Sequence, residues 1–335
     1  MAKITGTNGN DQHPHELEGT GKADQIYGLA GDDTLIGFGG NDLLVGGAGR
    51  DELFGSDGFD TASYAGSQRG VYVDLLGAFG EGGDAQGDAL YSIEALLGSG
   101  RTDYLYGDTA RNELSGGGGD DLLAGREGND RLSGGDGRDI LLGDAGADEL
   151  RGDGGIDFAL YYASDAAVTI DLAKGTGKGG TAEGDRFVSV EAIQGSGYAD
   201  RMIGNGAANW FRGEDGADVL TGNGGADRFY VDYLASSASD PDRITDFSHA
   251  QGDRIVTGDA NAQVEGFQAF RFIGTSEFTD VGQLRWYHSG GETIVEGNVD
   301  SAPGAELRLV LDHSLNLQAS DFIFGATGFA PPIQA

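Results

Sequence analysis

The chain has 335 residues, with 63 glycines, 5 prolines, no cysteine and a formal net charge of −34. A collagen triple helix is excluded because the glycine spacing is nine rather than three, and a flexible linker is excluded because large apolar residues recur at fixed offsets. The missing cysteines exclude disulfides and thiolate metal sites, while the acidic charge argues against nucleic acid and favours divalent cations as partners.

The first predicted element is a nine-residue repeat of the form Gly-Gly-x-Gly-x-Asp-x-U-x, where U is a large apolar residue. A degenerate unit spans residues 6–11, and a loop around Pro14 then breaks the period. We expect His13 and His15 in this loop to be solvated surface residues, with a transition-metal site as the alternative. Five regular units follow as block one, and they begin at Gly19, Gly28, Gly37, Gly46 and Gly55.

Residues 60–98 form a spacer without the repeat. This spacer matches residues 157–195 at a constant offset of 97, so that Val71–Leu75 aligns with Val168–Leu172. Both spacers alternate apolar and polar residues around a glycine-rich stretch, and such alternation is typical of strands. We therefore interpret the chain as a tandem duplication, with spacers that continue or flank the repeat structure.

Blocks two and three repeat the nine-residue unit seven and four times. Their units begin at Gly98, Gly107, Gly116, Gly125, Gly134, Gly143 and Gly152, and at Gly195, Gly204, Gly213 and Gly222. From about residue 230 glycine becomes less frequent, and the runs 267–273, 283–288, 292–296 and 306–311 predict a C-terminal antiparallel β cap that covers the last coil. Only residues 316–322 predict a short turn of helix. The expected domains are 1–97, 98–194, 195–229 and 230–335.

Each residue type in the unit has a separate physical role. Glycine permits positive φ in a tight turn, the aspartate brings a carboxylate to that turn, and the apolar residue points into a core. Six residues make a turn and three make a strand, so two units form a coil of about 18 residues with turns on opposite edges. The predicted fold is all-β, a parallel β-roll (β-solenoid) in three stacked blocks with the C-terminal cap. The predicted core residues are Ile26, Leu35, Leu44, Leu53, Leu105, Leu114, Leu123, Leu132, Leu141, Leu150, Met202, Phe211, Leu220 and Phe229.

Turns on one edge stack at the strand spacing of about 4.8 Å, so an ion between two turns collects oxygen atoms from both. Calcium takes six to eight oxygen ligands, whereas magnesium keeps its waters and zinc prefers nitrogen and sulfur. We therefore predict multiple Ca²⁺ ions, about ten if each bridges stacked units. At Asn112 and Asn209 an amide replaces the carboxylate, which predicts weaker or missing sites. The predicted ligands are Asp24, Asp33, Asp42, Asp51, Asp60, Asp103, Asp121, Asp130, Asp139, Asp148, Asp157, Asp200, Asp218 and Asp227.

Over residues 19–229 the chain resembles the RTX (haemolysin-type) calcium-binding repeat family. The segment 242–255 is similar to the segment after the last repeat in serralysin-type C-terminal domains and alginate-epimerase R-modules. This resemblance implies a secreted protein that crosses a type I secretion exporter unfolded and folds in extracellular calcium. It also implies an uncleaved C-terminal export signal, and Asp321–Phe324 resembles the end of such signals. The lack of a signal-peptide stretch and of a membrane-length apolar run agrees with this expectation.

No catalytic motif accompanies the repeats, because His-Glu-x-x-His and Gly-x-Ser-x-Gly are both absent. The expected function is a non-catalytic surface, matrix or accessory role for a calcium-folded β-roll. The alternative is a calcium-dependent module that binds an anionic polysaccharide beside an enzyme such as an alginate epimerase. Trp210 and Trp286–His288 would then stack on sugars, and otherwise they pack in the core or cap. A third interpretation is an enzyme with an unfamiliar site in residues 230–335.

Overall fold

The computed structural model describes residues 1–12, 16–231, 236–237, 239–258, 268–301, 304–325 and 329. His13 and His15 lie outside the described residues, as does the first residue of the predicted strand 267–273. The chain divides into two compact units, which are described separately: unit 1 comprises Met1–Ala159 and Asp185–Val190, and unit 2 comprises Leu160–Gly184 and Glu191–Ala335.

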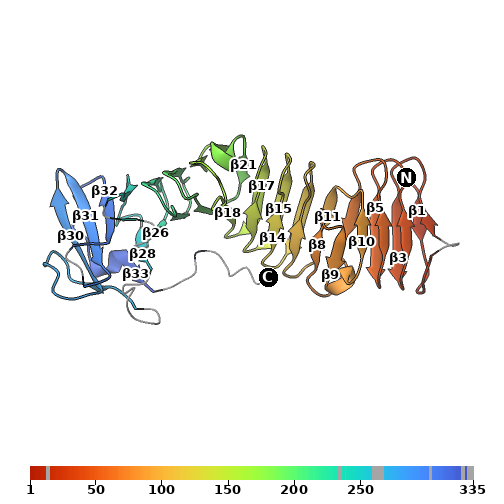
Figure 1. Cartoon of the computed structure of the whole chain (residues 1–335), viewed down its shortest axis with the longest axis horizontal. Helices are drawn as coiled ribbons and strands as arrows, with labels where there is room; N and C mark the ends of the chain where they lie inside the picture. The colour runs from red at the N-terminus through yellow and green to blue at the C-terminus, as the bar shows by residue number, and fades with distance from the viewer. Residues whose placement is uncertain are drawn as a thin grey trace. The chain divides into compact units, whose positions relative to one another are not determined.

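Unit 1 is a two-sheeted roll whose strands lie side by side in chain order (Figure 1). All strands of its first sheet are parallel. In order they are β1 (Lys3–Thr5), β3 (Gln25–Ala30), β5 (Leu43–Ala48), β7 (Thr61–Ser63), β11 (Ala95–Leu97), β13 (Glu113–Gly118), β15 (Arg131–Gly137), β17 (Glu149–Gly155) and β21 (Arg186–Val188).

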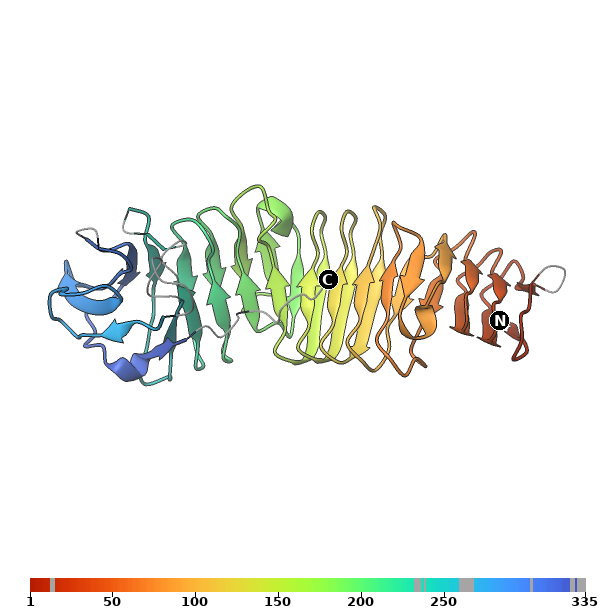
Figure 2. The ribbon, with the colours of Figure 1, turned by 60° about the horizontal axis from the view of Figure 1, so that its bottom comes forward.

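The second sheet of unit 1 faces the first, and the chain alternates between them through tight turns along both edges (Figure 2). Its order differs from the chain order only where the first spacer is inserted. The strands are β2 (Leu17–Glu18), β4 (Thr34–Ile36), β6 (Glu52–Phe54), β10 (Ala89–Tyr91), β9 (Phe79–Glu81), β8 (Tyr72–Asp74), β12 (Tyr104–Tyr106), β14 (Leu122–Ala124), β16 (Ile140–Leu142) and β18 (Phe158–Leu160).

The strand register confirms the predicted coil of two units. Parallel neighbours pair residues 18 positions apart, as in Leu114 with Leu132 and Leu105 with Leu123. Every predicted core residue of the three blocks is buried, with 1% or less of its surface exposed. Burial of one such side chain stabilises the fold by about 1.5–3 kcal/mol, so the stacked apolar residues supply the driving force of each coil.

The first spacer continues the roll, as predicted. Strand β8 pairs in parallel with β12, while β9 lies antiparallel to β8 and bridges to β10. The spacer thus inserts one antiparallel hairpin into an otherwise parallel sheet. A short 3₁₀ segment, η1 (Gly83–Ala85), follows the hairpin.

Unit 2 repeats this hairpin and continues the nine-residue coils. β19 pairs antiparallel with β20 and parallel with β23, and the 3₁₀ segment η2 (Gly180–Ala182) follows. The strand order of its first sheet is β20 (Thr176–Lys178), β19 (Thr169–Asp171), β23 (Arg201–Ile203), β25 (Val219–Thr221), β27 (Asp242–Ile244), β32 (Leu307–Leu311), β31 (Glu292–Asn298), β30 (Gln283–Ser289) and β29 (Arg271–Phe272). The strand order of its second sheet is β22 (Ala192–Gln194), β24 (Trp210–Arg212), β26 (Arg228–Val231), β28 (Arg254–Thr257) and β33 (Phe322–Phe324).

The end of unit 2 changes to antiparallel pairing. β32 joins β27 in parallel, but β31 pairs antiparallel with both β30 and β32. The predicted short turn of helix is the 3₁₀ segment η3 (Ala319–Asp321). Among the described residues there is no α-helix.

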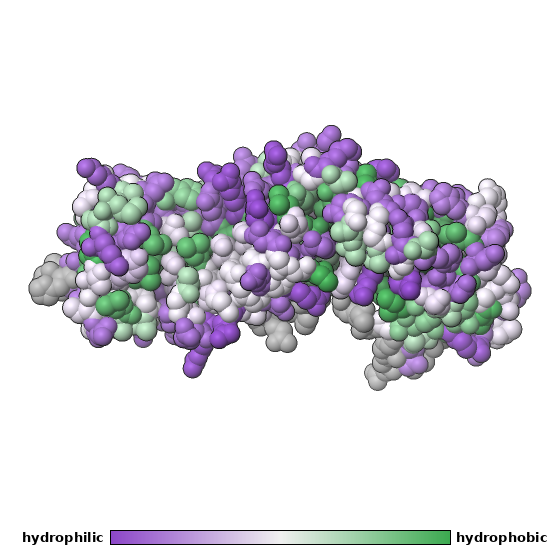
Figure 3. All heavy atoms as spheres, turned by 180° about the vertical axis from the view of Figure 1, so that it is seen from behind, coloured by the Kyte–Doolittle hydropathy of each residue, from purple (hydrophilic) through white to green (hydrophobic). Residues whose placement is uncertain are grey.

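No helix within the described part of the chain is both long and apolar enough to cross a membrane. On the face drawn in Figure 3, polar residues interleave with small apolar patches.

Candidate functional site

The predicted aspartates form buried ladders along the edges of both units. Each of the fourteen exposes 2% or less of its surface. Their Oδ1 atoms accept backbone N–H groups from the turn one coil earlier, as from Asp121 to Asp139 at 2.9 Å and from Asp130 to Asp148 at 2.8 Å. This bond recurs at every one of the fourteen positions. The carboxylates therefore stack at the repeat of the coil.

The second carboxylate oxygen has no such partner in most of the ladder. A buried polar atom without a hydrogen bond costs about 1–3 kcal/mol, and native structures contain few of them. A row of such atoms at equivalent positions therefore fits the ligand set of a cation. Among the described residues, the Oδ2 atom is buried without a hydrogen-bond partner in Asp33, Asp42, Asp51, Asp60, Asp121, Asp130, Asp139, Asp148 and Asp227.

These aspartates lie in turns of one backbone conformation, which we call open turns. In an open turn the second and fourth residues of the unit both have positive φ, as at Gly135 (110°) and Gly137 (147°). The second residue adopts this conformation even when it is Leu29, Phe38 or Arg126, which is uncommon for residues other than glycine. The open turns begin at Gly28, Gly37, Gly46, Gly55, Gly116, Gly125, Gly134, Gly143, Gly152, Gly213 and Gly222.

The remaining units form closed turns, in which the turn satisfies its own carboxylate. The N–H of the second residue donates to the aspartate Oδ2, at 2.8 Å from Thr20 to Asp24 and 2.6 Å from Ser196 to Asp200. In these units the second residue is Ser, Thr, Asp or Asn, and the fourth is not glycine. The closed turns begin at Gly19, Gly98, Gly107, Gly195 and Gly204.

Closed turns stand at the start of each block. Gly98 and Gly107 begin the two units of the first coil of block two, and Gly195 and Gly204 begin those of block three. In the Gly107 and Gly204 units asparagine replaces the aspartate, and its Oδ1 accepts the N–H of the second residue. Each block therefore opens with turns whose side-chain oxygens are already hydrogen-bonded.

Oxygen atoms of successive open turns converge on the first glycine of the unit. A Cβ on Gly116 would stand 2.2 Å from Oδ2 of Asp121 and 2.7 Å from the carbonyl oxygen of Gly134, one coil further on. The corresponding distances at Gly28 are both 2.5 Å, to Asp33 and Gly46. We call this space between stacked turns a cradle. Its walls are carboxylate and carbonyl oxygens, the ligands that calcium prefers.

Side chains alone do not complete a metal site. Nowhere in the described ranges do three His, Cys, Asp or Glu side chains group around one point. A cation in a cradle would therefore draw on backbone carbonyls as well as aspartates, which agrees with the flexible, oxygen-rich coordination of calcium.

The repeats match a known family model, described as the RTX calcium-binding nonapeptide repeat. The matched residues are 18–53, 27–62, 97–132, 125–159 and 194–230. The repeats belong to the RTX calcium-binding family. The RTX repeats cover the three predicted blocks and all fourteen predicted aspartates.

One solved structure similar to this chain is the solution structure of the AlgE6R3 subunit from the Azotobacter vinelandii mannuronan C5-epimerase. The identity is 21% over 70% of this chain and 84% of that chain, with a TM-score of 0.18. No curated protein matches the chain.

Burial raises the pKa of the RTX aspartates in open turns. The pKa of Asp130 and Asp139 rises to about 6. It rises to about 8 at Asp121 and Asp148, where neighbouring ladder carboxylates add to the effect of burial. Among the closed turns, hydrogen bonds, first from the Thr20 side chain, lower the pKa of Asp24, whereas burial raises the pKa of Asp103 and Asp200. Burial thus raises the pKa of ladder carboxylates in both types of turn.

These pKa shifts predict that acid stabilises the calcium-free fold. A carboxyl group with a raised folded pKa binds more protons when folded, so its stabilising contribution is complete below about pH 4 and is lost as pH rises through the folded value. With folded pKa values of about 6 to 8, the calcium-free protein should contain more β structure at pH 5 than at pH 8. Far-ultraviolet circular dichroism of calcium-stripped protein in metal-free buffers measures this. More β structure at pH 8 than at pH 5 would contradict the assignment.

Further ladder positions escaped the sequence pattern because insertions break the nine-residue period. In unit 1, Asp88 and Glu94 accept the N–H groups of Asp51 and Asp60, and Asp185 accepts the N–H of Asp148. The Tyr64 hydroxyl donates to the second oxygen of Asp88 at 3.0 Å, so this spacer position is closed by a side chain. In unit 2 the ladder continues as Asp218 to Asp242 and Asp227 to Asp253. A hydrophobic strand directly after each aspartate, as at Ala89–Tyr91, is the signal that would have found them.

Arg126 is the second residue of the open turn that begins at Gly125, one coil after the Gly107 turn. Its guanidinium brings a positive charge to this turn. Its guanidinium donates to both oxygens of Asp74 at 2.8 Å and to the carbonyl oxygen of Gly107 at 2.6 Å. Burial opposes ionisation of Asp74, but the hydrogen bonds from Arg126 and from the Gly77 N–H leave its pKa lowered. Asp74 thus pairs with arginine in this structure.

Proposed function

We propose that the chain binds calcium in the cradles between stacked open turns and folds when it does so. The observation that carries this proposal is the row of buried Oδ2 atoms that have no hydrogen-bond partner in open turns. In closed turns, by comparison, the N–H of the second residue donates to the aspartate Oδ2. A divalent cation supplies the positive charge that this row of buried carboxylates requires.

Calcium binding and folding are coupled in this account. Without metal, stacking the coils buries aspartate on aspartate, which costs free energy through desolvation and repulsion. Asp218 illustrates the cost, because burial and the adjacent Asp242 carboxylate raise its pKa to about 9. An ion that binds only the stacked turns therefore contributes its binding free energy to folding.

The two turn types determine where the sites lie. Five cradles, all in unit 1, have an open turn on both sides. They lie between the following pairs of units, named by their first glycine: Gly28/Gly46, Gly37/Gly55, Gly116/Gly134, Gly125/Gly143 and Gly134/Gly152. Five further cradles join a closed turn to an open one. We propose that the first five bind calcium most tightly, because both turns have the open backbone conformation there, and that all stacked pairs together give about ten ions.

We further propose that the folded chain acts outside the cell in a non-catalytic surface, matrix or accessory role, after export through a type I secretion exporter. Sites of extracellular modules bind calcium at roughly 10⁻⁴–10⁻³ M, and a lattice of this affinity stays empty in the cytosol. The net charge of −34 supports export as an unfolded, self-repelling chain.

Opening a closed turn tests the proposal. Ser99→Gly with Arg101→Gly gives the Gly98 unit the open-turn pattern and removes the N–H capping geometry at Asp103. We expect one additional tightly bound calcium per chain by equilibrium dialysis. The reverse change, Gly117→Ser with Gly119→Arg, should remove tight sites beside the Gly116 turn. Unchanged stoichiometry in both folded variants would refute the assignment of sites to open turns.

A further inference from the structure

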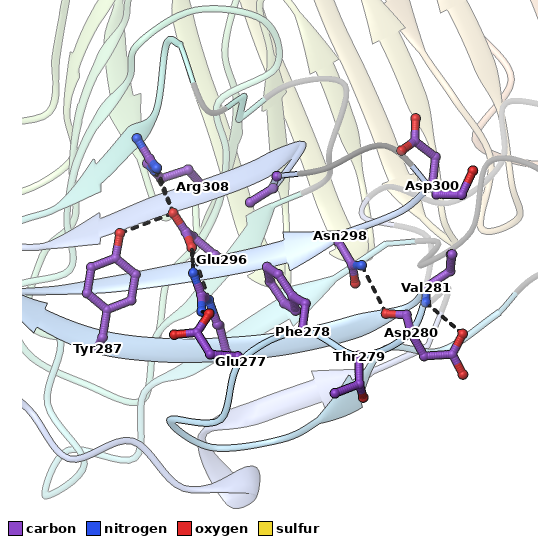
Figure 4. A pocket seen from close by; sticks show the side chains of 14 residues that line it. Glu277, Phe278, Thr279, Asp280, Val281, Tyr287, Glu296, Asn298, Asp300 and Arg308 are labelled. Atoms are coloured by element: carbon purple, nitrogen blue, oxygen red, sulfur yellow. Dashed lines mark hydrogen bonds and ion pairs between the residues drawn. The ribbon is translucent and has the colours of Figure 1, made fainter.

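Beyond the repeats, unit 2 contains a polar pocket that calcium binding does not use. It has a volume of about 830 Å³ and lies against β30, β31 and β32 (Figure 4). This volume is within the range of small-ligand sites, which is about 300–1,000 Å³. The residues on which the argument rests are Glu277, Phe278, Asp280, Arg285, Glu296 and Arg308.

The floor of the pocket is a fixed ionic network around Glu296, which exposes only 3% of its surface. One oxygen accepts from the Tyr287 hydroxyl at 3.1 Å and from Arg308 Nη2 at 2.6 Å, and the other accepts from Arg285 Nη2 at 2.9 Å. Burial opposes ionisation of Glu296, but these hydrogen bonds, led by Arg308, lower its pKa below the usual value. Buried ion pairs of this kind add little stability over apolar packing, whereas they orient two guanidinium groups at the pocket wall.

The charges of the lining argue against an anionic ligand. Four carboxylates, of Glu277, Asp280, Glu296 and Asp300, face two guanidiniums. Both arginines already bond to Glu296, and Arg285 also pairs with Glu277. A phosphate or carboxylate ligand would therefore meet an excess of negative charge. A cationic ligand would find the carboxylates of Glu277 and Glu296 already paired with these guanidiniums.

A neutral ligand rich in hydroxyl groups fits both kinds of lining. One hydroxyl donates to a carboxylate and accepts from an N–H at the same time. A pocket lined by both carboxylates and guanidinium groups therefore favours a hydroxyl-rich ligand over an ion. Phe278 supplies a half-buried aromatic ring beside these groups, with Arg285 over the ring at 4.6 Å. Aromatic side chains bury large apolar area, and the C–H face of a sugar ring is a suitable surface to cover them.

We propose that this pocket binds a residue of a neutral saccharide. Phe278 packs against the sugar ring, and the exposed carboxylate of Asp280 accepts its hydroxyl groups, while the network around Glu296 holds the wall in place. This site is separate from the calcium cradles, and the anionic polysaccharide considered from the sequence does not suit it.

Calorimetric titration of the calcium-loaded full chain tests the inference. The probes are neutral hexaoses of glucose, mannose and galactose, in both α and β linkage, and hexauronates as the anionic comparison. We expect saturable, one-site binding of at least one neutral hexaose and none of the hexauronates. Phe278→Ala and Asp280→Ala should each weaken it about tenfold, which corresponds to about 1.4 kcal/mol.

Matched controls separate the pocket from general surface effects. Tyr198→Ala removes an exposed aromatic ring and Asp165→Ala an exposed carboxylate, both from unit 2 but outside the pocket lining. Neither should change the affinity. Absence of binding by every neutral probe, preference for hexauronates, or an unchanged affinity in folded Phe278→Ala and Asp280→Ala proteins would each overturn the proposal. Calcium stoichiometry is measured separately, so this failure would leave the cradles unaffected.

Discussion

Gly134→Ala is expected to raise the calcium concentration at the folding midpoint by tenfold or more. The added Cβ would stand 2.1 Å from Oδ2 of Asp139, closer than any tolerated contact, so it would displace a carboxylate that forms part of the cradle. Overpacking alone costs about 1–3 kcal/mol, and the substitution also disturbs the cradles on both sides of this turn. Far-ultraviolet circular dichroism through a calcium titration measures the shift.

Gly100→Ala is the matched control for this prediction. Gly100 lies in a closed turn with φ outside the positive range, and no atom lies within 4 Å of the added Cβ. Its folding midpoint should stay close to that of the unmodified chain. Equal midpoints for the two variants would show that the space beside Gly134 has no part in calcium binding.

Asp139→Asn is expected to have the second-largest effect, again about tenfold or more in the calcium midpoint. The amide keeps an oxygen for the 2.9 Å bond from the Asp121 N–H, but it turns the other ligand atom into a donor. A cation site does not tolerate a donor in the position of a carboxylate oxygen. The loss is therefore specific to the metal.

The control for this substitution lies in the same turn. Asp136→Asn makes the same change of charge three residues earlier, where the side chain is exposed. Screening by solvent makes such a charge worth little, so the calcium midpoint should move less than about twofold. If Asp136→Asn and Asp139→Asn shift the midpoint equally, bulk charge rather than coordination drives folding.

The sequence predicted the repeat architecture well because it is local and periodic. A fixed spacing of nine places each apolar residue inside and each aspartate at a turn, so the buried positions of Leu123 and Asp121 follow without knowledge of the tertiary structure. The match to RTX repeats agrees with this derivation.

The difference between open and closed turns was also present in the sequence, but the aspartate pattern concealed it. Asp103 and Asp121 look alike, although Ser99 caps one and Gly117 leaves the other open. The fourth residue of the unit separates the two types, because it is a glycine with positive φ in every open turn and is not glycine in any closed turn.

The pocket of unit 2 could not be derived from the sequence. Glu296 and Arg308 lie on β31 and β32, and Phe278 comes from a loop before β30. The strands themselves were predicted from their alternation, but their antiparallel register is what brings Arg285 opposite Glu296. Long-range pairing of this kind leaves no periodic signal.

The most direct test of the central claim is far-ultraviolet circular dichroism at pH 8 during a calcium titration that starts in chelator, with magnesium in parallel. Calcium-driven folding predicts a disordered spectrum in chelator and a cooperative change to β structure at roughly 10⁻⁴–10⁻³ M calcium. Magnesium should produce no such change at the same concentrations. A fully β-structured chain in chelator that calcium does not alter would contradict the account, because the apolar core alone would then hold the roll.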